Sequence, residues 1–271
     1  MANPWDDAAH LAKRRLDWAG CGIDRFEVLA DAFLATEPYE IVTEVEREGQ
    51  NAHFTYEFKV LQHPPPELSF AAGDVIHNLR SALDNLVWAV GRTVKARKLP
   101  LLEFHLSTDD AFSRYLAKIR KFPDPIKDWI TSIQPNRAPN YPDMFYALHL
   151  LWGGDKHRTP VLMADASYKP IELGYVGERQ PLMKIRVNKF GDQKHDQKIA
   201  WAVVPWKDKD DFKPGFTPHV AFDADGPAGT DRIVGRPQEV TEYLRHIQKS
   251  ILDRVIPRFE PYFAVSKFGE G

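Results

Sequence analysis

The amino-acid sequence predicts an α+β protein, in which a helical bundle core carries an N-terminal β-hairpin and a C-terminal strand-rich region closed by a helix. Apolar residues recur at helical spacing through most of the first 158 residues, and they alternate with period two in the hairpin and after residue 159. Helices and strands therefore come in blocks rather than as βαβ units, which favours the α+β class. The chain has 271 residues, 43% of them hydrophobic, which is enough for a sizeable core.

The first 61 residues predict a long helix followed by the hairpin. Apolar residues recur at near-helical spacing from 5 to about 35, with Pro4 at the entry and Pro38 at the end. Segments 39–48 and 52–61 each alternate apolar and polar residues, and the turn-like run EGQN joins them. This pattern predicts two antiparallel strands.

Four further helices are predicted after the hairpin. Residues 68–95 carry the longest amphipathic pattern of this group. The segment from Ser107 begins with a capping residue followed by acidic residues, and the segment from Asp124 has a proline in its first turn. The apolar segment from Asp143 is predicted to stop at Gly153–Gly154, because glycine commonly ends helices.

From Thr159 onward the pattern changes to successive strands with turns between them, followed by a closing helix at 236–256. The predicted strand segments are 159–168, 171–177, 181–190, 198–206 and 217–225. The chain is therefore divided into a helical region 1–158, with its hairpin at 39–61, and an antiparallel β region with a C-terminal helix at 159–271. The two parts form one continuous domain if the last helix packs against the first helices.

Composition excludes several classes of protein. The net charge of −2, with acids and bases mixed, gives no general attraction to nucleic acid, so any such contact needs a local basic patch. The single cysteine, Cys21, rules out a disulfide within the chain and is expected to be a small core residue of the first helix. No segment approaches the ~18 apolar residues of a membrane span, and the charged N-terminus differs from a signal peptide. We therefore expect a soluble, cytoplasmic protein that does not contact membranes.

The helix GDVIHNLRSALDNLVWAV, residues 73–90, has an unusual polar face. A solvated helix surface favours Lys, Glu, Gln and Arg, whereas Asp, Asn and Ser each weaken a helix by roughly 0.5 kcal/mol relative to Ala. The face is therefore expected to meet a second helix, a second subunit or a ligand. Its polar residues are Asp74, His77, Asn78, Arg80, Ser81, Asp84 and Asn85.

Two interpretations of this face stay open. Asp74 can reach His77 at i+3 and raise its proton affinity, which suits a catalytic or binding site. The same groups can instead satisfy one another in a network that fixes helix packing. The run GGDKHR adds a second polar cluster, which could join Arg80 in a composite anion site or place cations at the negative end of a helix. That cluster consists of Asp155, Lys156, His157 and Arg158.

The run HNLRSALDNLVW, followed about seventy residues later by GGDKHR, is similar to a widespread set of bacterial and phage proteins. Its helix also resembles the signature helix of HEPN proteins (higher eukaryotes and prokaryotes nucleotide-binding). The resemblance covers about residues 68–158 and implies an α-helical bundle, often dimeric, and in many members a metal-independent ribonuclease. The family motif is Arg, four to six residues, then His. It implies an Arg that binds phosphate and a His that performs acid–base chemistry on the ribose 2′-OH.

Arg80 occupies the position of the family Arg, but the His position at the four-residue spacing is Asn85. Asn cannot titrate, so it cannot act as a general acid or base. We therefore expect His77 or His157 to take that role. The resemblance and the residues together give catalytic candidates Arg80, His77, Asp84 and His157, and binding candidates Asp74, Ser81, Asn85, Asp155, Lys156 and Arg158.

The leading hypothesis is a HEPN-like protein that binds or cleaves RNA or a nucleotide, with its catalysis either intact or lost. One alternative is a non-catalytic homodimeric scaffold or phage-related accessory protein that uses the polar helix face as an interface. Another is a small-ligand sensor. We expect no cofactor and no metal, because the chain has no His-Glu-x-x-His, no cysteine pair and no phosphate-binding glycine loop.

Overall fold

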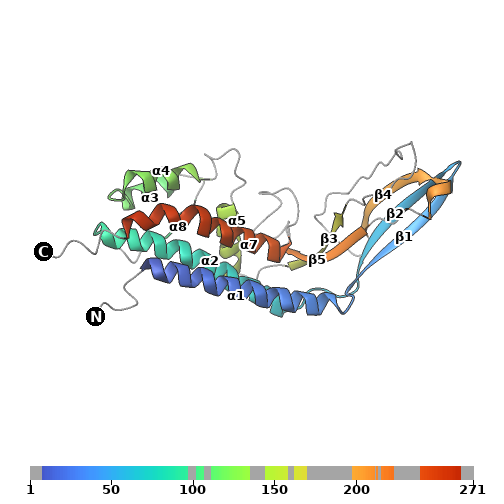
Figure 1. Ribbon diagram of the computed structural model, residues 1–271, viewed down its shortest axis with the longest axis horizontal. Coiled ribbons are helices and arrows are strands. Elements are labelled where there is room, and N and C mark those ends of the chain that lie inside the picture. The colour runs from blue at the N-terminus through green and yellow to red at the C-terminus, as the bar shows by residue number, and fades with distance from the viewer. Residues whose placement is uncertain are drawn as a thin grey trace.

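A computed structural model shows an elongated molecule with a helical bundle at one end and a β-sheet arm at the other (Figure 1). The structure describes residues 8–96, 102–106, 111–134, 144–157, 162–169, 197–210, 212, 215–222 and 239–263. The helices are α1 (Ala8–Leu34), α2 (Pro66–Thr93), α3 (Ala111–Lys118), α4 (Asp124–Ser132), α5 (Met144–His157), α7 (Val240–Ser250) and α8 (Ile256–Phe259). The strands are β1 (Tyr39–Glu48), β2 (Asn51–Val60), β3 (Leu162–Lys169), β4 (Gln197–Pro205) and β5 (Gly215–Phe222). The predicted α+β class is confirmed.

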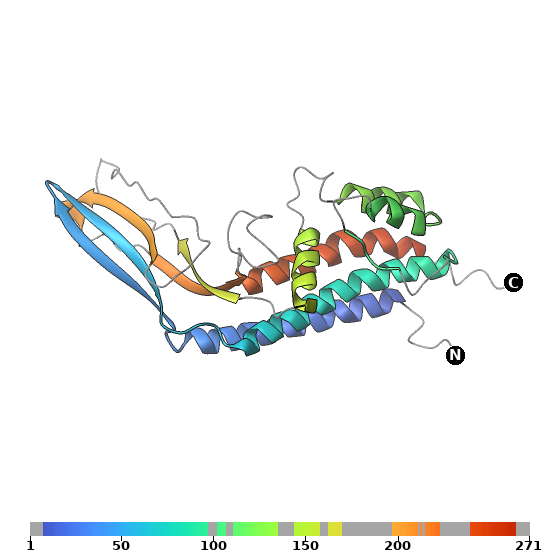
Figure 2. The ribbon, with the colours of Figure 1, turned by 180° about the vertical axis from the view of Figure 1, so that it is seen from behind.

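The bundle is built on the α1–α2 pair, with α7 and α8 lying along it (Figures 1 and 2). Gly22 allows α1 and α2 to approach closely, because a Cβ at this position would lie 2.8 Å from Cγ2 of Val75. Arg245 of α7 donates hydrogen bonds to Asp24 at 2.9 Å and to Glu27 at 2.6 Å. The C-terminal helix α7 therefore packs against the first helix, α1.

The arm is a three-stranded antiparallel sheet in the order β1-β2-β4, which projects away from the bundle (Figure 2). In the predicted hairpin, Tyr39 pairs with Val60 and Glu48 pairs with Asn51, and Gly49 supplies a left-handed turn residue at φ +61°. β4 pairs with the other edge of β2. β3 and β5 form a separate two-stranded antiparallel sheet.

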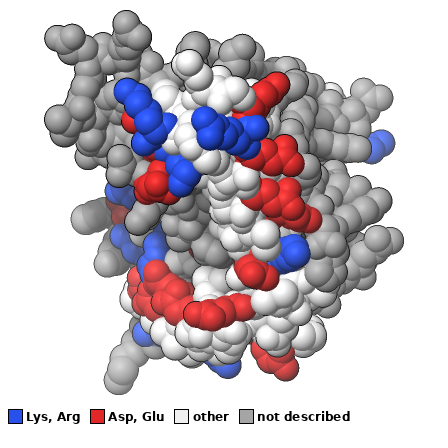
Figure 3. Space-filling view, turned by 90° about the vertical axis from the view of Figure 1, so that its right-hand side faces the viewer, with Lys and Arg blue, Asp and Glu red and all other residues white. Residues whose placement is uncertain are grey.

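The arm has one apolar and one acidic face. Residues of β2 alternate in burial, and Phe54, Tyr56 and Phe58 point into the core. Viewed from the arm end, Asp and Glu side chains gather at the lower left and along the right of the described surface, whereas Lys and Arg lie mainly near the top (Figure 3). One face of β1 carries Glu40, Glu44, Glu46 and Glu48.

Two expectations about helices are wrong. α5 does not stop at Gly153–Gly154 but continues to His157. A glycine ends a helix when it adopts a left-handed conformation, and Gly49 is the only glycine with positive φ in the described part of the chain. Cys21 is exposed rather than buried, because it lies on one side of α1 with the exposed residues Asp17, Arg25 and Val28. The predicted capping residue Ser107 and the predicted strands at 171–177 and 181–190 lie outside the described residues.

Contacts cross the predicted boundary near residue 158. β4 completes the sheet of the N-terminal hairpin, and α7 packs against α1. One hydrophobic cluster contains Ile23 and Phe54 together with Val204 and Leu244. Whether the chain has one domain or two stays a prediction. Among the described helices, none combines the length and the apolar composition that crossing a lipid bilayer requires.

Candidate functional site

The polar face of α2 divides into an outer and an inner part. Asp74 and His77 are exposed, and the Nε2 of His77 lies 3.5 Å from the Oγ of half-buried Ser81. Asn78 is buried, where it accepts a hydrogen bond from Arg15 at 2.9 Å. The polar residues further along α2 face the inside of the bundle, so the inner part is where a shielded site can form.

Arg80 lies at the centre of the inner part, with only 2% of the residue exposed. Its Nη2 donates to the carbonyl oxygen of Phe104 and lies 3.2 Å from Oδ1 of Asp84. The same Asp84 oxygen accepts a hydrogen bond from the backbone N–H of Phe104 at 2.7 Å. Arg80 and Asp84 therefore clamp the segment 102–106, which connects α2 to α3, onto α2.

Aromatic rings surround the guanidinium group. Its carbon, Cζ, lies 5.1 Å from the ring centroid of Trp152 and 6.0 Å from that of Phe104. Trp152 comes from α5, so the cation contacts side chains from three segments of the chain. Such cation–π contacts favour a desolvated cation, but they do not replace its hydrogen bonds.

Two of the three guanidinium nitrogens of Arg80, Nε and Nη1, are buried and have no hydrogen-bond partner among the described residues. A buried donor without a partner costs roughly 1–3 kcal/mol, and more when the group is charged. Oxyanions such as phosphate and carboxylate are the groups that arginine binds most readily. The inner face of α2 thus presents positive charge and unused donors together.

Two histidines accompany Arg80. His149 lies on α5, one turn before Trp152, with ring centroids 6.3 Å apart. Burial, assisted by the positive charge of Arg80, lowers the pKa of His149 to about 4. Burial also lowers the pKa of His105, although Glu103 opposes the change. Both imidazoles are therefore neutral near pH 7. His149 Nδ1 and His105 Nε2 are buried without a hydrogen-bond partner within the described ranges.

Asp84 and Tyr115 complete the cluster. Burial raises the pKa of Asp84, while the charge of Arg80 and the Phe104 N–H oppose that change. Tyr115, from α3, has its ring centroid 5.2 Å from that of His105, and burial raises its pKa as well. We call the following six residues the Arg80 cluster: Arg80, Asp84, His105, Tyr115, His149 and Trp152.

Sequence reasoning identified Arg80 and Asp84 but missed His105, Tyr115 and His149. Those residues come from segments far from Arg80 in the chain, so no local spacing connects them. One signal was available: His149 stands alone in the apolar run MFYALHLLW. An isolated titratable group in such a run needs a partner or a neutral state when it is buried.

The other predicted residues lie apart from the cluster or are not described. Asn85 is half-buried beside Asp84 on α2. Asp155, Lys156 and His157 belong to the last turn of α5 rather than to a segment beyond it, and the structure describes their backbone only. Arg158 lies outside the described residues. Convergence of this run with Arg80 stays a prediction.

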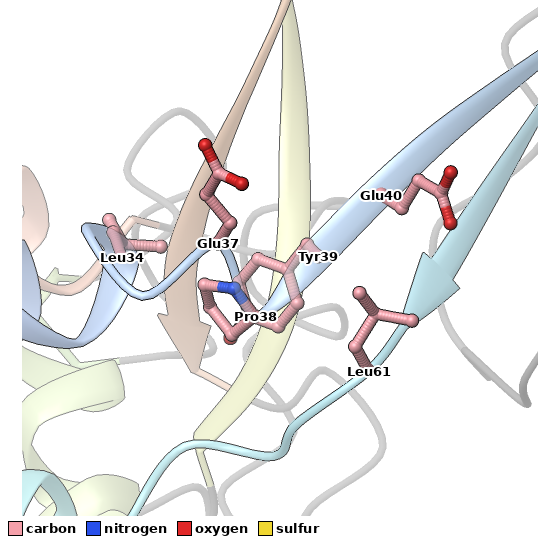
Figure 4. Close-up of a pocket in the computed structure, with 6 residues that line it drawn as sticks. All are labelled: Leu34, Glu37, Pro38, Tyr39, Glu40 and Leu61. Atoms are coloured by element: carbon pink, nitrogen blue, oxygen red, sulfur yellow. The ribbon is translucent and has the colours of Figure 1, made fainter.

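A separate pocket lies at the junction between α1 and the arm (Figure 4). Its volume is about 440 Å³, and Leu34, Glu37, Pro38, Tyr39, Glu40 and Leu61 line it. It shares no residue with the Arg80 cluster. The part of the chain that the structure describes contains no group of three or more His, Cys, Asp or Glu side chains placed to hold a metal ion.

Comparisons with protein-family models, with curated proteins and with solved structures found no match.

Proposed function

We propose that the chain is a HEPN-like protein that binds RNA or a nucleotide through a phosphate group at Arg80. The observation that carries the proposal is the buried guanidinium whose Nε and Nη1 have no hydrogen-bond partner among the described residues. A phosphate oxygen would satisfy these donors and neutralise the charge. Arg80 also occupies the position of the family Arg within a helical bundle.

His149 is the residue that we assign to proton transfer, in place of His77 and His157. His77 is exposed on the outer part of α2, whereas the positive charge of Arg80 acts directly on His149. A neutral imidazole with an unpaired Nδ1 can accept the proton of a ribose 2′-OH. A phosphate bound at Arg80 would offset the positive charge that lowers the pKa of His149, and would so make it a stronger base.

Asp84 is a positioning residue in this proposal. It lies 3.2 Å from Nη2 of Arg80 and also holds the Phe104 N–H. Nη2 is the nitrogen engaged in this way, so Nε and Nη1 are the donors that a phosphate would use. Cleavage would also need a protonated group beside the leaving 5′ oxygen. His105 is neutral near pH 7 in the free chain, and it would take this role once a bound phosphate offsets the positive charge of Arg80, which helps to lower the pKa of His105.

The test combines binding and cleavage. Fluorescently labelled single-stranded RNA is titrated with the full-length chain by anisotropy, and the same RNA is followed on denaturing gels. We expect Arg80→Lys to weaken binding at least tenfold, and His149→Gln to retain binding but abolish cleavage. Arg25→Ala, on the exposed side of α1, is the matched control and should leave both unchanged. Folded wild-type chain that neither binds RNA nor binds a nucleotide would rule out the proposal.

A second candidate, the homodimeric scaffold, is favoured by a different observation. Phe70, Asp74 and His77 follow one stripe of α2 at i, i+4 and i+7, and Phe70 is 60% exposed. Trp18 of the neighbouring helix α1 is 69% exposed. Large exposed aromatic residues on adjacent helices are typical of protein interfaces. The interface would then use the outer part of the α2 polar face, and Arg80 would have no role in it.

A further inference from the structure

Two basic segments of the chain contain no acidic residue. The run GRTVKARK, residues 91–98, holds four cations, and the run SRYLAKIRK, residues 113–121, holds another four. The chain as a whole has a net charge of −2, so this is a strong local excess of positive charge.

The fold brings these segments together. The C-terminal end of α2 and the turn between α3 and α4 lie at the same end of the bundle, opposite the arm (Figures 1 and 2). Nζ of Lys121 donates a hydrogen bond to the backbone carbonyl of Lys95 at 3.3 Å, which fixes the contact. The described cations of this surface are all exposed: Arg92, Lys95, Arg114, Lys118, Arg120 and Lys121.

The basic surface is connected to the Arg80 cluster along α2. Arg80, Asp84, Trp88 and Arg92 follow one another at four-residue spacing, so they share one side of the helix. Arg92 lies over the ring of half-buried Trp88, with 5.1 Å between Cζ and the ring centroid. Arg80 and Arg92 are therefore roughly 18 Å apart along the helix axis, at about 1.5 Å per residue.

A second connection runs through α3. The positive charge of Lys118 acts on His105, which belongs to the Arg80 cluster. Glu103 acts on His105 in the opposite direction. Lys118 therefore lies close enough to the Arg80 cluster to influence one of its residues.

We infer that Trp88, Arg92, Lys95, Lys118 and Lys121 form a track that binds single-stranded RNA and leads it to Arg80. Cations spaced along an exposed surface contact successive phosphates, and an aromatic side chain among them offers a base a ring on which to stack. A track of this kind binds the strand without reading its sequence. The inference rests on the proposed function, because it supplies the strand that the Arg80 cluster would receive.

The experiment compares an oligonucleotide with a mononucleotide. Fluorescence anisotropy measures the affinity for a 15-nucleotide single-stranded RNA, which would contact the track. Isothermal titration calorimetry measures the affinity for a mononucleotide, which would contact only the Arg80 cluster. We expect Lys95→Glu/Lys121→Glu to weaken RNA binding at least tenfold and to leave mononucleotide binding unchanged. The matched control is Arg25→Glu/Lys207→Glu, which changes net charge equally at exposed positions on α1 and on the turn after β4 and should have little effect.

Salt dependence and strand type provide further readouts. Each phosphate neutralised on a single strand contributes about −0.7 to the slope of log K against log salt concentration, so loss of two lysines should reduce the slope by roughly 1.4. Trp88→Leu keeps an apolar side chain but removes the aromatic ring, so it should weaken RNA binding about fivefold or more through the loss of stacking. We expect single-stranded RNA to bind more tightly than duplex RNA.

The outcomes separate the two proposals. Unchanged RNA affinity in the double lysine variant, with mononucleotide binding retained, overturns the track and leaves the proposed function standing. Tighter binding of duplex than of single-stranded RNA also overturns the track. A third outcome is RNA binding that depends on Lys95 and Lys121 but not on Arg80, together with no binding of the mononucleotide. This outcome supports the track and rules out the proposed function.

Discussion

Arg80 and Asp84 lie one turn apart on α2 and hold the two backbone polar groups of a single residue, Phe104. Arg80 donates to its carbonyl oxygen, and Asp84 accepts from its N–H at 2.7 Å. The cation and the carboxylate thereby fix the segment that carries both Phe104 and His105. A histidine from outside α2 is in this way positioned by residues of α2.

Replacing Asp84 by Asn should lower the free energy of unfolding by about 1–3 kcal/mol, because buried Arg80 loses its ion pair with Asp84. The Asn side-chain oxygen can still accept from the Phe104 N–H, so the loss reports the charge. Urea denaturation measures the effect. Asp74→Asn, at an exposed position of the same helix, should change stability by less than about 0.5 kcal/mol. Equal midpoints for the two variants would contradict the clamp.

Stability should decrease as the pH falls from 6.5 toward 4. The pKa of His149 is lowered from 6.5 to about 4 in the folded chain, so within this window the unfolded chain binds more protons and is favoured. Asp84 has the opposite effect on the free energy of unfolding as the pH falls, because its raised pKa lets the folded chain bind a proton more readily than the unfolded chain. Urea midpoints measured across this range should show a weaker pH dependence for His149→Gln than for the wild-type chain. Parallel curves for the two would contradict the burial of a neutral His149 beside Arg80.

Binding of a nucleotide phosphate at Arg80 should raise the pKa of His149, because the ligand offsets the positive charge that helps to lower it. NMR titration of the imidazole Cε1–H signals, with and without nucleotide, measures the shift. The signal of exposed His77 is the internal control and should respond little to the ligand. A His149 titration that does not move in saturating nucleotide would place the phosphate elsewhere.

Gly153 and Gly22 should respond oppositely to alanine. A Cβ at Gly153 meets no atom within 4 Å, and α5 is helical there, so Gly153→Ala should stabilise the chain by about 1 kcal/mol. A Cβ at Gly22 would lie 2.8 Å from Cγ2 of Val75, so Gly22→Ala should destabilise it by separating α1 and α2. Thermal unfolding measures both. Destabilisation by Gly153→Ala would mean that α5 ends at the glycine pair after all.

If the scaffold candidate is correct, the wild-type chain sediments as a dimer and Phe70→Asp sediments as a monomer. A charge placed on an exposed aromatic residue disrupts an interface without entering the core. Leu61→Asp, at the base of the arm with 61% exposure, is the matched control and should leave the dimer intact. A monomeric wild-type chain in sedimentation velocity would remove this candidate.

The elements that the sequence predicted well are those with strong local periodicity. The hairpin was expected at 39–48 and 52–61 and is found at Tyr39–Glu48 and Asn51–Val60. The second long helix was expected at 68–95 and is Pro66–Thr93. In both cases the local pattern of apolar residues is enough to predict the element, and the tertiary contacts of the folded chain are consistent with that element.

The features that escaped prediction depend on distant contacts or on conformations that a residue type permits but does not require. Gly153 is compatible with both a helix and a turn, and α5 continues through it as a helix. His105 and His149 reach Arg80 only through the packing of the connector and α5 on α2. The pairing of β4 with β2 likewise joins segments that no short-range pattern connects.

The order of the arm strands has a consequence for synthesis. β2 is the central strand, yet β4, which covers one of its edges, begins only at Gln197. While the ribosome makes the intervening residues, the nascent hairpin carries an open strand edge next to its apolar face. Chains truncated before Gln197 therefore keep this strand edge open. Such fragments should aggregate or bind chaperones rather than accumulate as folded bundles.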